Sequence, residues 1–283
     1  MNINEALIKG YGELKEAGID TYQLDTQLLM CHVINQSKLY IIMNRDRELS
    51  KEDYEAFQSL VLRRKTREPM AYILNDVEFM GIDFYVEQGV LIPRPDTEVL
   101  VEECIHIIKE RKTKNICDMC CGSGAIGISI AALTEDTRVA AFDISDYAIK
   151  VSNINVERQN LGDRVTVEKS DLFEVAEVKN MKFDMIVSNP PYIEEEVIPT
   201  LMEDVRDYEP HLALSGGEDG LDFYRKICDK STMLLNHDGY LCFEIGYNQE
   251  EAVKKLMEER NFIDVYGLKD LAGNSRVVIG RLA

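Results

Sequence analysis

The sequence predicts an α/β domain with a doubly wound sheet, preceded by a small helical bundle and a β-hairpin linker. From residue 115 onward, short apolar runs alternate with helical segments, which is typical of a largely parallel sheet covered on both faces. The first 75 residues have helical periodicity only. Residues 76–92 change to near-alternation of apolar and polar positions. We therefore expect a helical domain over 1–75, a hairpin linker over 76–95 and the α/β domain over 96–283.

The amino-terminal segment predicts three helices. Asn4 is placed to cap the first, and the second is expected over 24–33. The third is expected to begin after Ser50, which forms a capping pattern with an acidic residue three positions later. The basic cluster at its end, residues 63–67, is expected to be a solvated helix terminus that is favourably placed against the helix dipole.

The hairpin prediction depends on five apolar residues in near-alternation around Met80-Gly81. They are Val77 and Phe79 before it and Ile82, Phe84 and Val86 after it. A glycine between two such runs is typical of a tight turn.

A glycine-rich turn follows the first strand expected in the α/β part. The strand covers 115–119, with Asp118 near its end, and a helix of small residues is expected over 125–133. Such a turn lets the backbone approach a bound nucleotide closely. The candidate ligand-binding residues of the turn are Cys120, Cys121, Gly122, Ser123 and Gly124.

Acidic residues follow the next two strands. Asp143 ends the strand expected over 138–142, and Asp171 with Leu172 follows the strand expected over 164–168. The carboxyl ends of parallel strands share one edge of the sheet, and an acid after the second strand can accept hydrogen bonds from both ribose hydroxyls. These positions predict a site for a ligand that contains a nucleoside.

The fourth strand, expected over 183–187, ends in Ser188-Asn189-Pro190-Pro191-Tyr192. Two prolines cannot continue a sheet, and they fix the backbone, so the carbonyls beside them point in set directions. The Asn189 side chain adds an acceptor, and Tyr192 adds a flat ring. This combination suits a planar NH2 group and is similar to the signature of methyltransferases that act on amide or exocyclic amine nitrogen.

Three classes of protein compete for this pattern. Residues 122–127 match the dinucleotide fingerprint, which would indicate an NAD-dependent Rossmann enzyme, and a nucleotide-sensing module could use the same fold without catalysis. Asp118, Asp143 and the Asn-Pro-Pro-Tyr motif together favour S-adenosylmethionine, because hydride transfer does not need that set. A sensing module would leave Asn189 and Tyr192 without a role.

Composition limits the partners. The chain has 51 acidic and 32 basic residues and a formal net charge of −19, so it is expected to repel nucleic-acid backbones. We expect a cytoplasmic protein without a membrane segment or signal sequence. The seven cysteines are expected to be reduced thiols. Cys117, Cys120 and Cys121 are similar to half of a zinc site, but no second half stands at metal spacing, so no metal is expected.

The family resemblance covers nearly the whole chain. Its motifs are the helical amino-terminal part, 92–98 (Ile-Pro-Arg-Pro-Asp-Thr-Glu), the glycine turn, 189–192, 209–214, 216–221 and 243–246 (Phe-Glu-Ile-Gly). Together they resemble the HemK/PrmC release-factor glutamine methyltransferases. That family has a helical substrate-docking domain, a hairpin linker and a methyltransferase domain. It methylates the glutamine of the Gly-Gly-Gln motif in class I peptide chain release factors.

The resemblance also implies roles for the candidate residues. S-adenosylmethionine would become S-adenosylhomocysteine at a site made of the turn 120–124, Asp118, Asp143 and Asp171-Leu172, with Asn189 also beside it. The glutamine would be held by 189–192, with Asn189, Pro190 and Tyr192 as the catalytic residues. Cys120 stands where the family has a glycine, and Leu172 stands where it often has an aromatic residue. The main alternative is an adenine-specific amino methyltransferase acting on nucleic acid.

Overall fold

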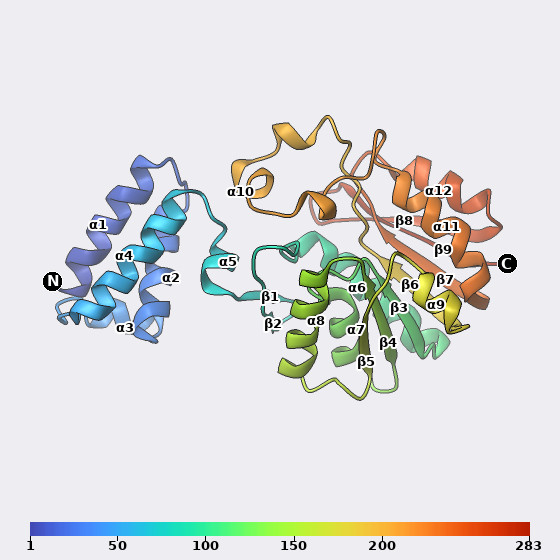
Figure 1. Ribbon diagram of the computed structural model, residues 1–283, viewed down its shortest axis with the longest axis horizontal. Helices are drawn as coiled ribbons and strands as arrows, with labels where there is room; N and C mark the ends of the chain where they lie inside the picture. Colours follow the sequence, from blue (N-terminus) through green and yellow to red (C-terminus); the bar gives the residue numbers. More distant parts are fainter. The chain divides into compact units, whose positions relative to one another are not determined.

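The computed structural model describes residues 1–283, which form two compact units. The first unit combines residues 1–76 with residues 202–208, and the second combines 77–201 with 209–283 (Figure 1). The first unit is therefore discontinuous in sequence, because the chain leaves the second unit after Leu201 and returns to it at Glu209.

The first unit is entirely helical. Its helices are α1 (Ile3–Glu16), α2 (Tyr22–Ile34), α3 (Lys38–Met43), α4 (Lys51–Lys65), α5 (Met70–Leu74) and α10 (Glu203–Arg206). Apolar side chains from α1, α2 and α4 meet in one core, where Leu14, Leu29 and Phe57 are completely buried. Three of these helices match the predicted ones, whereas the short α3 and α5 were not predicted.

The helix caps correct one prediction and confirm another. Asn2, not Asn4, caps α1: its side chain accepts from the Glu5 amide (2.9 Å), and the Glu5 carboxylate accepts from the Asn2 amide (3.0 Å). Asn4 lies inside the helix because this reciprocal pair already satisfies the helix start two residues earlier. Ser50 caps α4 as predicted, accepting from the Asp53 amide at 2.9 Å.

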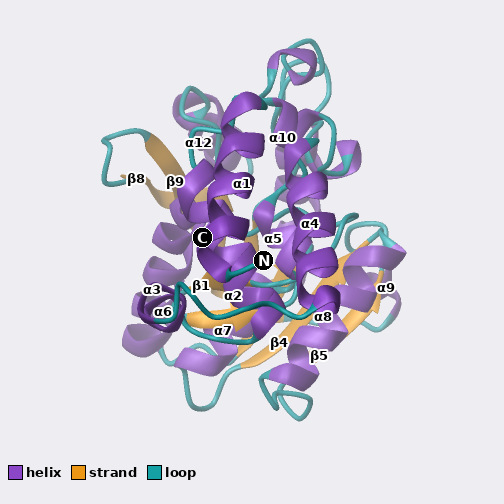
Figure 2. Cartoon of the chain, turned by 90° about the vertical axis from the view of Figure 1, so that its left-hand side faces the viewer, coloured by secondary structure: helices purple, strands orange, loops and turns teal.

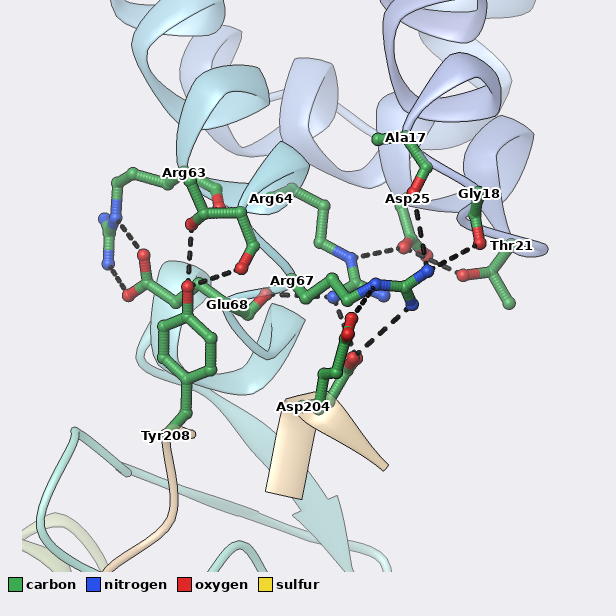
Figure 3. A network of polar contacts seen from close by, with 12 residues as sticks. Ala17, Gly18, Thr21, Asp25, Arg63, Arg64, Arg67, Glu68, Asp204 and Tyr208 are labelled. Atoms are coloured by element: carbon green, nitrogen blue, oxygen red, sulfur yellow. Dashed lines mark hydrogen bonds and ion pairs between the residues drawn. The ribbon is translucent and has the colours of Figure 1, made fainter. Parts of the chain in front are cut away.

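The basic end of α4 is not simply solvated, which corrects the prediction for residues 63–67. The Arg64 side chain is 9% exposed and donates to Asp25 Oδ2 at 2.8 Å and to Asp204 Oδ2 at 3.0 Å. Arg67 pairs with Glu203 at 2.6 Å. We call residues 202–208, which supply Asp204 and Glu203, the strap; its Tyr208 hydroxyl donates to the Thr66 carbonyl at 2.6 Å (Figure 3). The prediction was wrong because these acids lie far away in the sequence.

The second unit contains a seven-stranded sheet in the order β5-β4-β3-β6-β7-β9-β8. The strands are β3 (Asn115–Met119), β4 (Arg138–Asp143), β5 (Val165–Lys169), β6 (Phe183–Ser188), β7 (Leu235–Glu244), β8 (Phe262–Lys269) and β9 (Ser275–Leu282). Strands β3 to β7 are parallel, and β9 is antiparallel to both β7 and β8. The doubly wound α/β prediction is confirmed, while β8 was not predicted.

Helices cover both faces of this sheet. The helices of the second unit are α6 (Glu98–Arg111), α7 (Ala125–Leu133), α8 (Asp146–Arg158), α9 (Glu174–Val178), α11 (Asp222–Leu234) and α12 (Glu250–Glu258), with short 3₁₀ turns at Pro95–Thr97, Ile198–Thr200 and His211–Ala213. One buried core joins α6 and α7 to one face, and another joins α11 and α12 to the opposite face. Figure 2 shows α8 beside β4 and β5 at one edge.

The predicted hairpin is present as β1 (Val77–Phe79) and β2 (Ile82–Phe84), paired antiparallel. Met80 and Gly81 at its turn have φ values of 54° and 71°, as a two-residue turn of this kind requires. Phe79 and Phe84 are buried and pack into the core beside α6, so the hairpin belongs to the second unit. No helix of the protein is long and apolar enough to cross a membrane.

The sheet order places a crevice at the carboxyl ends of β3 and β6. The chain proceeds from β3 to β4 and β5 in one direction and then to β6 and β7 in the other, so the winding reverses between β3 and β6. Met119 and Ser188, the last residues of these two strands, are in register. Ligands of open α/β sheets bind outside the carboxyl ends of the strands at such a reversal.

Candidate methyl-transfer site

A cavity of about 220 Å³ lies at this edge of the sheet, within the second unit. Its lining includes residues from each of the predicted candidate segments: Cys120, Cys121, Gly122, Ser123, Asp143, Asp171, Leu172, Asn189 and Pro191. Four predicted site residues, Asp118, Gly124, Pro190 and Tyr192, do not line it. The structure therefore brings the glycine turn, two acids and the first part of the Asn-Pro-Pro-Tyr motif to one place.

The glycine turn has an unusual backbone. Cys120, Gly122 and Gly124 have φ values of 61°, 56° and 79°, in the left-handed region that favours glycine. Cys120 thus holds a side chain where glycine is the less strained residue. Helix α7 begins directly after Gly124, so its first free N–H groups adjoin the turn.

Asp118 lies behind the turn instead of in the cavity, which corrects its predicted place in direct contact with a ligand. Its side chain is completely buried, and Oδ2 accepts from the Gly127 amide at 2.8 Å while Oδ1 has no partner. Burial raises the pKa of this carboxyl to about 7, although the Gly127 bond opposes the rise. Asp118 connects β3 to the first turn of α7 because its strand position points it into the helix.

Asp143 lies at the end of β4 with its carboxylate at the cavity. Oδ2 accepts from the Gly122 amide and Oδ1 accepts from the Ser145 amide, both at 2.9 Å. Burial raises the pKa of Asp143, and the bonds from Ser145 and Gly122 oppose the rise. Since each carboxylate oxygen has a second lone pair, the group can accept further hydrogen bonds from a ligand's hydroxyls.

Asp171 and Leu172 follow β5 and line the same cavity. Leu172 has a φ of 47°, and its carbonyl accepts from the Ser170 hydroxyl at 2.6 Å. Phe142, Ile144 and the Leu172 side chain give this part of the cavity an apolar lining. A flat, weakly polar group fits such a lining.

The Asn-Pro-Pro-Tyr motif begins where β6 ends. The Ser188 hydroxyl donates to the Met119 carbonyl at 2.7 Å and ties β6 to the end of β3. Asn189 and Pro191 line the cavity, whereas Pro190 is buried and Tyr192 is half-buried beside it. The Tyr192 hydroxyl donates to Glu244 Oε1 at 3.4 Å, and the Tyr192 carbonyl accepts from Gln249 Nε2 at 3.0 Å.

Glu244 ends β7 and is 2% exposed. Burial raises the pKa of its carboxyl to about 7. Burial also raises the pKa of the Tyr192 hydroxyl, and the adjacent Glu244 adds to this rise. Both groups therefore lose a proton less readily than exposed Glu and Tyr side chains do.

An ion pair that sequence reasoning did not assign to the site lies at the cavity wall. Arg94, which lines the cavity, pairs with the buried Glu209, and Pro210 after it also lines the cavity. Burial raises the pKa of Glu209, and Arg94 opposes the rise. In the sequence, proline stands next to both Arg94 and Glu209. These prolines indicate a fixed backbone, but they do not show that Arg94 and Glu209 lie close together.

The thiols near the turn are structural. Burial raises the pKa of Cys117 and Cys121 well above the ordinary value of 9.0, and nearby acids add to the effect. Thiols kept protonated in this way are poor metal ligands and nucleophiles. No group of three or more His, Cys, Asp or Glu residues is arranged to hold a metal ion.

Comparison with known proteins identifies the class to which this fold and site belong. The family profile of the methyltransferase small domain matches residues 95–218, and that of the PrmC N-terminal domain matches residues 5–74. The T. thermophilus 16S rRNA N2 G1207 methyltransferase, solved in complex with AdoMet and guanosine, superposes with a TM-score of 0.53 at 16% identity, covering 74% of this chain and 50% of that one. The protein is a methyltransferase with a Rossmann-like fold.

Two relatives define the family more narrowly. The release factor glutamine methyltransferase of Clostridium botulinum is 47% identical over 281 residues, which is 99% of each chain. That of Clostridium acetobutylicum is 46% identical over 279 residues, covering 99% of this chain and 98% of the relative. The chain therefore belongs to the release factor glutamine methyltransferase family.

Proposed function

We propose that this protein transfers a methyl group from S-adenosylmethionine to the side-chain amide nitrogen of a glutamine, in the Gly-Gly-Gln motif of class I peptide chain release factors. The observation that carries the proposal is the shared cavity. Asn189, which can hold a planar NH2 group, lines the same space as the glycine turn and Asp143. The names of the two clostridial relatives support the same acceptor.

The residues of the cavity fit the proposed cofactor. S-adenosylmethionine supplies an electrophilic methyl group on a positively charged sulfur, and S-adenosylhomocysteine remains after transfer. Residues 120–124 would hold the methionine end, Asp143 the ribose hydroxyls, and Asp171 with Leu172 the adenine side. Asp118 would act indirectly, by fixing the start of α7 through Gly127.

The chemistry required of the protein is to hold a poor nucleophile. An amide nitrogen reacts weakly because its lone pair is delocalised into the carbonyl. The Asn189 side-chain oxygen and the Pro190 carbonyl would accept the two amide hydrogens, hold the nitrogen in line with the methyl group and stabilise the positive charge that develops on it. The Tyr192 ring would pack on the amide plane, and Pro191 would keep the backbone rigid.

The transfer needs no dedicated base. One N–C bond forms while the S–C bond breaks, and the alkylated amide then loses one hydrogen to water as a proton. Because that proton becomes strongly acidic only after transfer, a neutral acceptor pair is sufficient. Glu244 and Tyr192 do not line the cavity.

The two parts of the chain take separate roles in this proposal. The helical part, residues 1–75, would dock the release factor, residues 76–95 would be the hairpin linker, and residues 96–283 would carry the chemistry. The net charge of −19 would favour encounter with basic patches on the partner and disfavour nucleic acid. A role in translation termination would place this reaction in the cytoplasm.

Methyl transfer from tritiated S-adenosylmethionine tests the proposal. The substrates are a purified class I release factor, its Gly-Gly-Gln variant with the glutamine changed to alanine, and duplex DNA. We expect label on the unmodified factor only. Label on DNA, or equal label on the alanine variant, would overturn the proposed acceptor.

A further inference from the structure

The Tyr192 main chain is fixed by a side chain from the loop after β7. Gln249 is 6% exposed, and its Nε2 donates to the carbonyls of Tyr192 at 3.0 Å and Gly220 at 3.3 Å. Its Oε1 accepts from the Gly246 amide at 2.9 Å, and the Tyr224 hydroxyl oxygen lies 3.4 Å from it. A carboxamide has two N–H donors, so both donors of Gln249 are used on the two carbonyls.

Gln249 is itself rigidly mounted. The Tyr224 hydroxyl donates its hydrogen to the Glu244 carbonyl at 2.9 Å, and Tyr224 is completely buried with its ring edge-on to Phe243, 5.1 Å between centroids. The Gln249 side chain is therefore held from the end of β7 and from α11. Buried hydrogen-bonded networks restrict the conformations of their members.

The segment that follows Tyr192 is enclosed by a glycine loop. The Ile193 amide donates to the Leu214 carbonyl at 2.9 Å, and the Gly216 amide donates to the Ile193 carbonyl at 2.8 Å. A Cβ atom added to Gly216 would stand 2.7 Å from the Tyr192 Cα, and one added to Gly220 would stand 2.6 Å from Gln249 Nε2. Only glycine fits at these two positions, so the main chain at Tyr192 is closely confined.

We propose that Gln249 is a positioning residue for methyl transfer. By holding the Tyr192 carbonyl, it fixes the end of the Asn-Pro-Pro-Tyr segment and so sets the direction in which Asn189 and Pro190 present their acceptor oxygens. Prolines have no N–H with which to anchor this segment, which leaves the anchoring to its last residue. The inference rests on the proposed function, since it assigns to Gln249 the alignment of the acceptor amide.

The Gln249→Glu variant removes the two hydrogen bonds that Gln249 Nε2 donates to the carbonyls of Tyr192 and Gly220. Glutamate has nearly the same shape and keeps an oxygen for the Gly246 amide, but its carboxylate donates nothing to the two carbonyls. We expect kcat for release-factor methylation to fall about 10- to 100-fold, as a small misplacement of a reacting group can cause. The Kd for S-adenosylmethionine should stay within about threefold, because Asp143 and the glycine turn are untouched.

Three further measurements make the test specific. Gln159→Glu is the matched control, because Gln159 Nε2 donates to one backbone carbonyl, that of Asp83 at 2.9 Å, and neither residue lines the cavity. Gln249→Met removes the same donors without burying a charge and replaces Gln249→Glu if that variant does not fold. Amide hydrogen exchange over residues 189–197, measured without release factor, should accelerate in the Gln249 variants only.

The outcomes separate this inference from the proposed function. Unchanged kcat and unchanged exchange in the Gln249 variants would overturn it. Equal losses of kcat and cofactor affinity would overturn it as well, since they would indicate a general structural role. If the unaltered protein transfers no label to a release factor, the proposed function fails, and the exchange comparison still decides whether Gln249 holds the motif.

Discussion

The two halves of the cavity are built on different principles. On the glycine-turn side, carboxylates accept from backbone amides nearby in sequence: Asp118 from Gly127, nine residues away, and Asp143 from Gly122, 21 residues away. On the Asn-Pro-Pro-Tyr side, Tyr192 is held by Glu244, 52 residues away, and by Gln249, 57 residues away. The first half is local and holds the Asp143 carboxylate, whereas the second is assembled from distant segments and presents the uncharged Asn189 side chain. We call them the charged half and the neutral half. A charged half suits ribose hydroxyls, and a neutral half suits an amide.

The largest effect is expected from a substitution at Asn189, in the neutral half of the cavity. Asn189→Ala removes an acceptor assigned to the transition state, so kcat should fall on the order of 10²-fold or more. The Kd for S-adenosylmethionine, measured by calorimetry, should change only a few-fold. Asn153→Ala is the control, since Asn153 is exposed on α8 and bonds only its own helix. Near-normal turnover of Asn189→Ala would reduce Asn189 to a turn residue.

A smaller effect, on stability, is expected at Glu244. Its folded-state pKa of about 7 lies above the ordinary 4.5, so between these values the unfolded chain has lost a proton that the folded protein keeps. Stability therefore falls as the pH rises through this window, by about 2 kcal/mol from this group between pH 5 and pH 8. Glu244→Gln keeps an acceptor for Tyr192 but cannot ionise.

Thermal unfolding at both pH values checks this expectation. The melting temperature of Glu244→Gln relative to the unaltered protein should be higher at pH 8 than at pH 5. Glu251→Gln on α12 is a suitable control because Glu251 is exposed. A constant difference between the variant and the unaltered protein would show that Glu244 is not a buried, protonated acid.

The smallest effect is expected at Asp143, in the charged half. Asp143→Asn keeps an acceptor oxygen but removes the charge that strengthens its hydrogen bonds, a loss of about 1.4 kcal/mol. The Kd for S-adenosylmethionine should rise about tenfold, with kcat at saturating cofactor nearly unchanged. A fall in kcat at unchanged Kd, measured by calorimetry and steady-state kinetics, would contradict the division of the cavity into two halves.

The same difference explains what the sequence could predict. The sheet, the glycine turn and Asp143 follow from strand–turn–acid patterns within short stretches, because parallel strands bring their carboxyl ends together. Gln249 and Glu209 give no such signal, since their roles depend on segments that only the fold brings near Tyr192 and Arg94. Asp118 was predicted to contact the cofactor, whereas the structure places its side chain behind the glycine turn, against α7. The side to which a strand residue points depends on the helix that packs there.

The strap has a consequence for how the chain is made. Arg64 and Asp204 are 140 residues apart, and all of β3, β4, β5 and β6 lies between them. During synthesis from the amino terminus, residues 1–76 emerge first. Arg64 can pair with Asp204 only after strands β3 to β6 have been made. The amino-terminal 76 residues therefore emerge without the strap, and the ribosome releases this last piece of the helical unit only after the Asn-Pro-Pro-Tyr segment has been made.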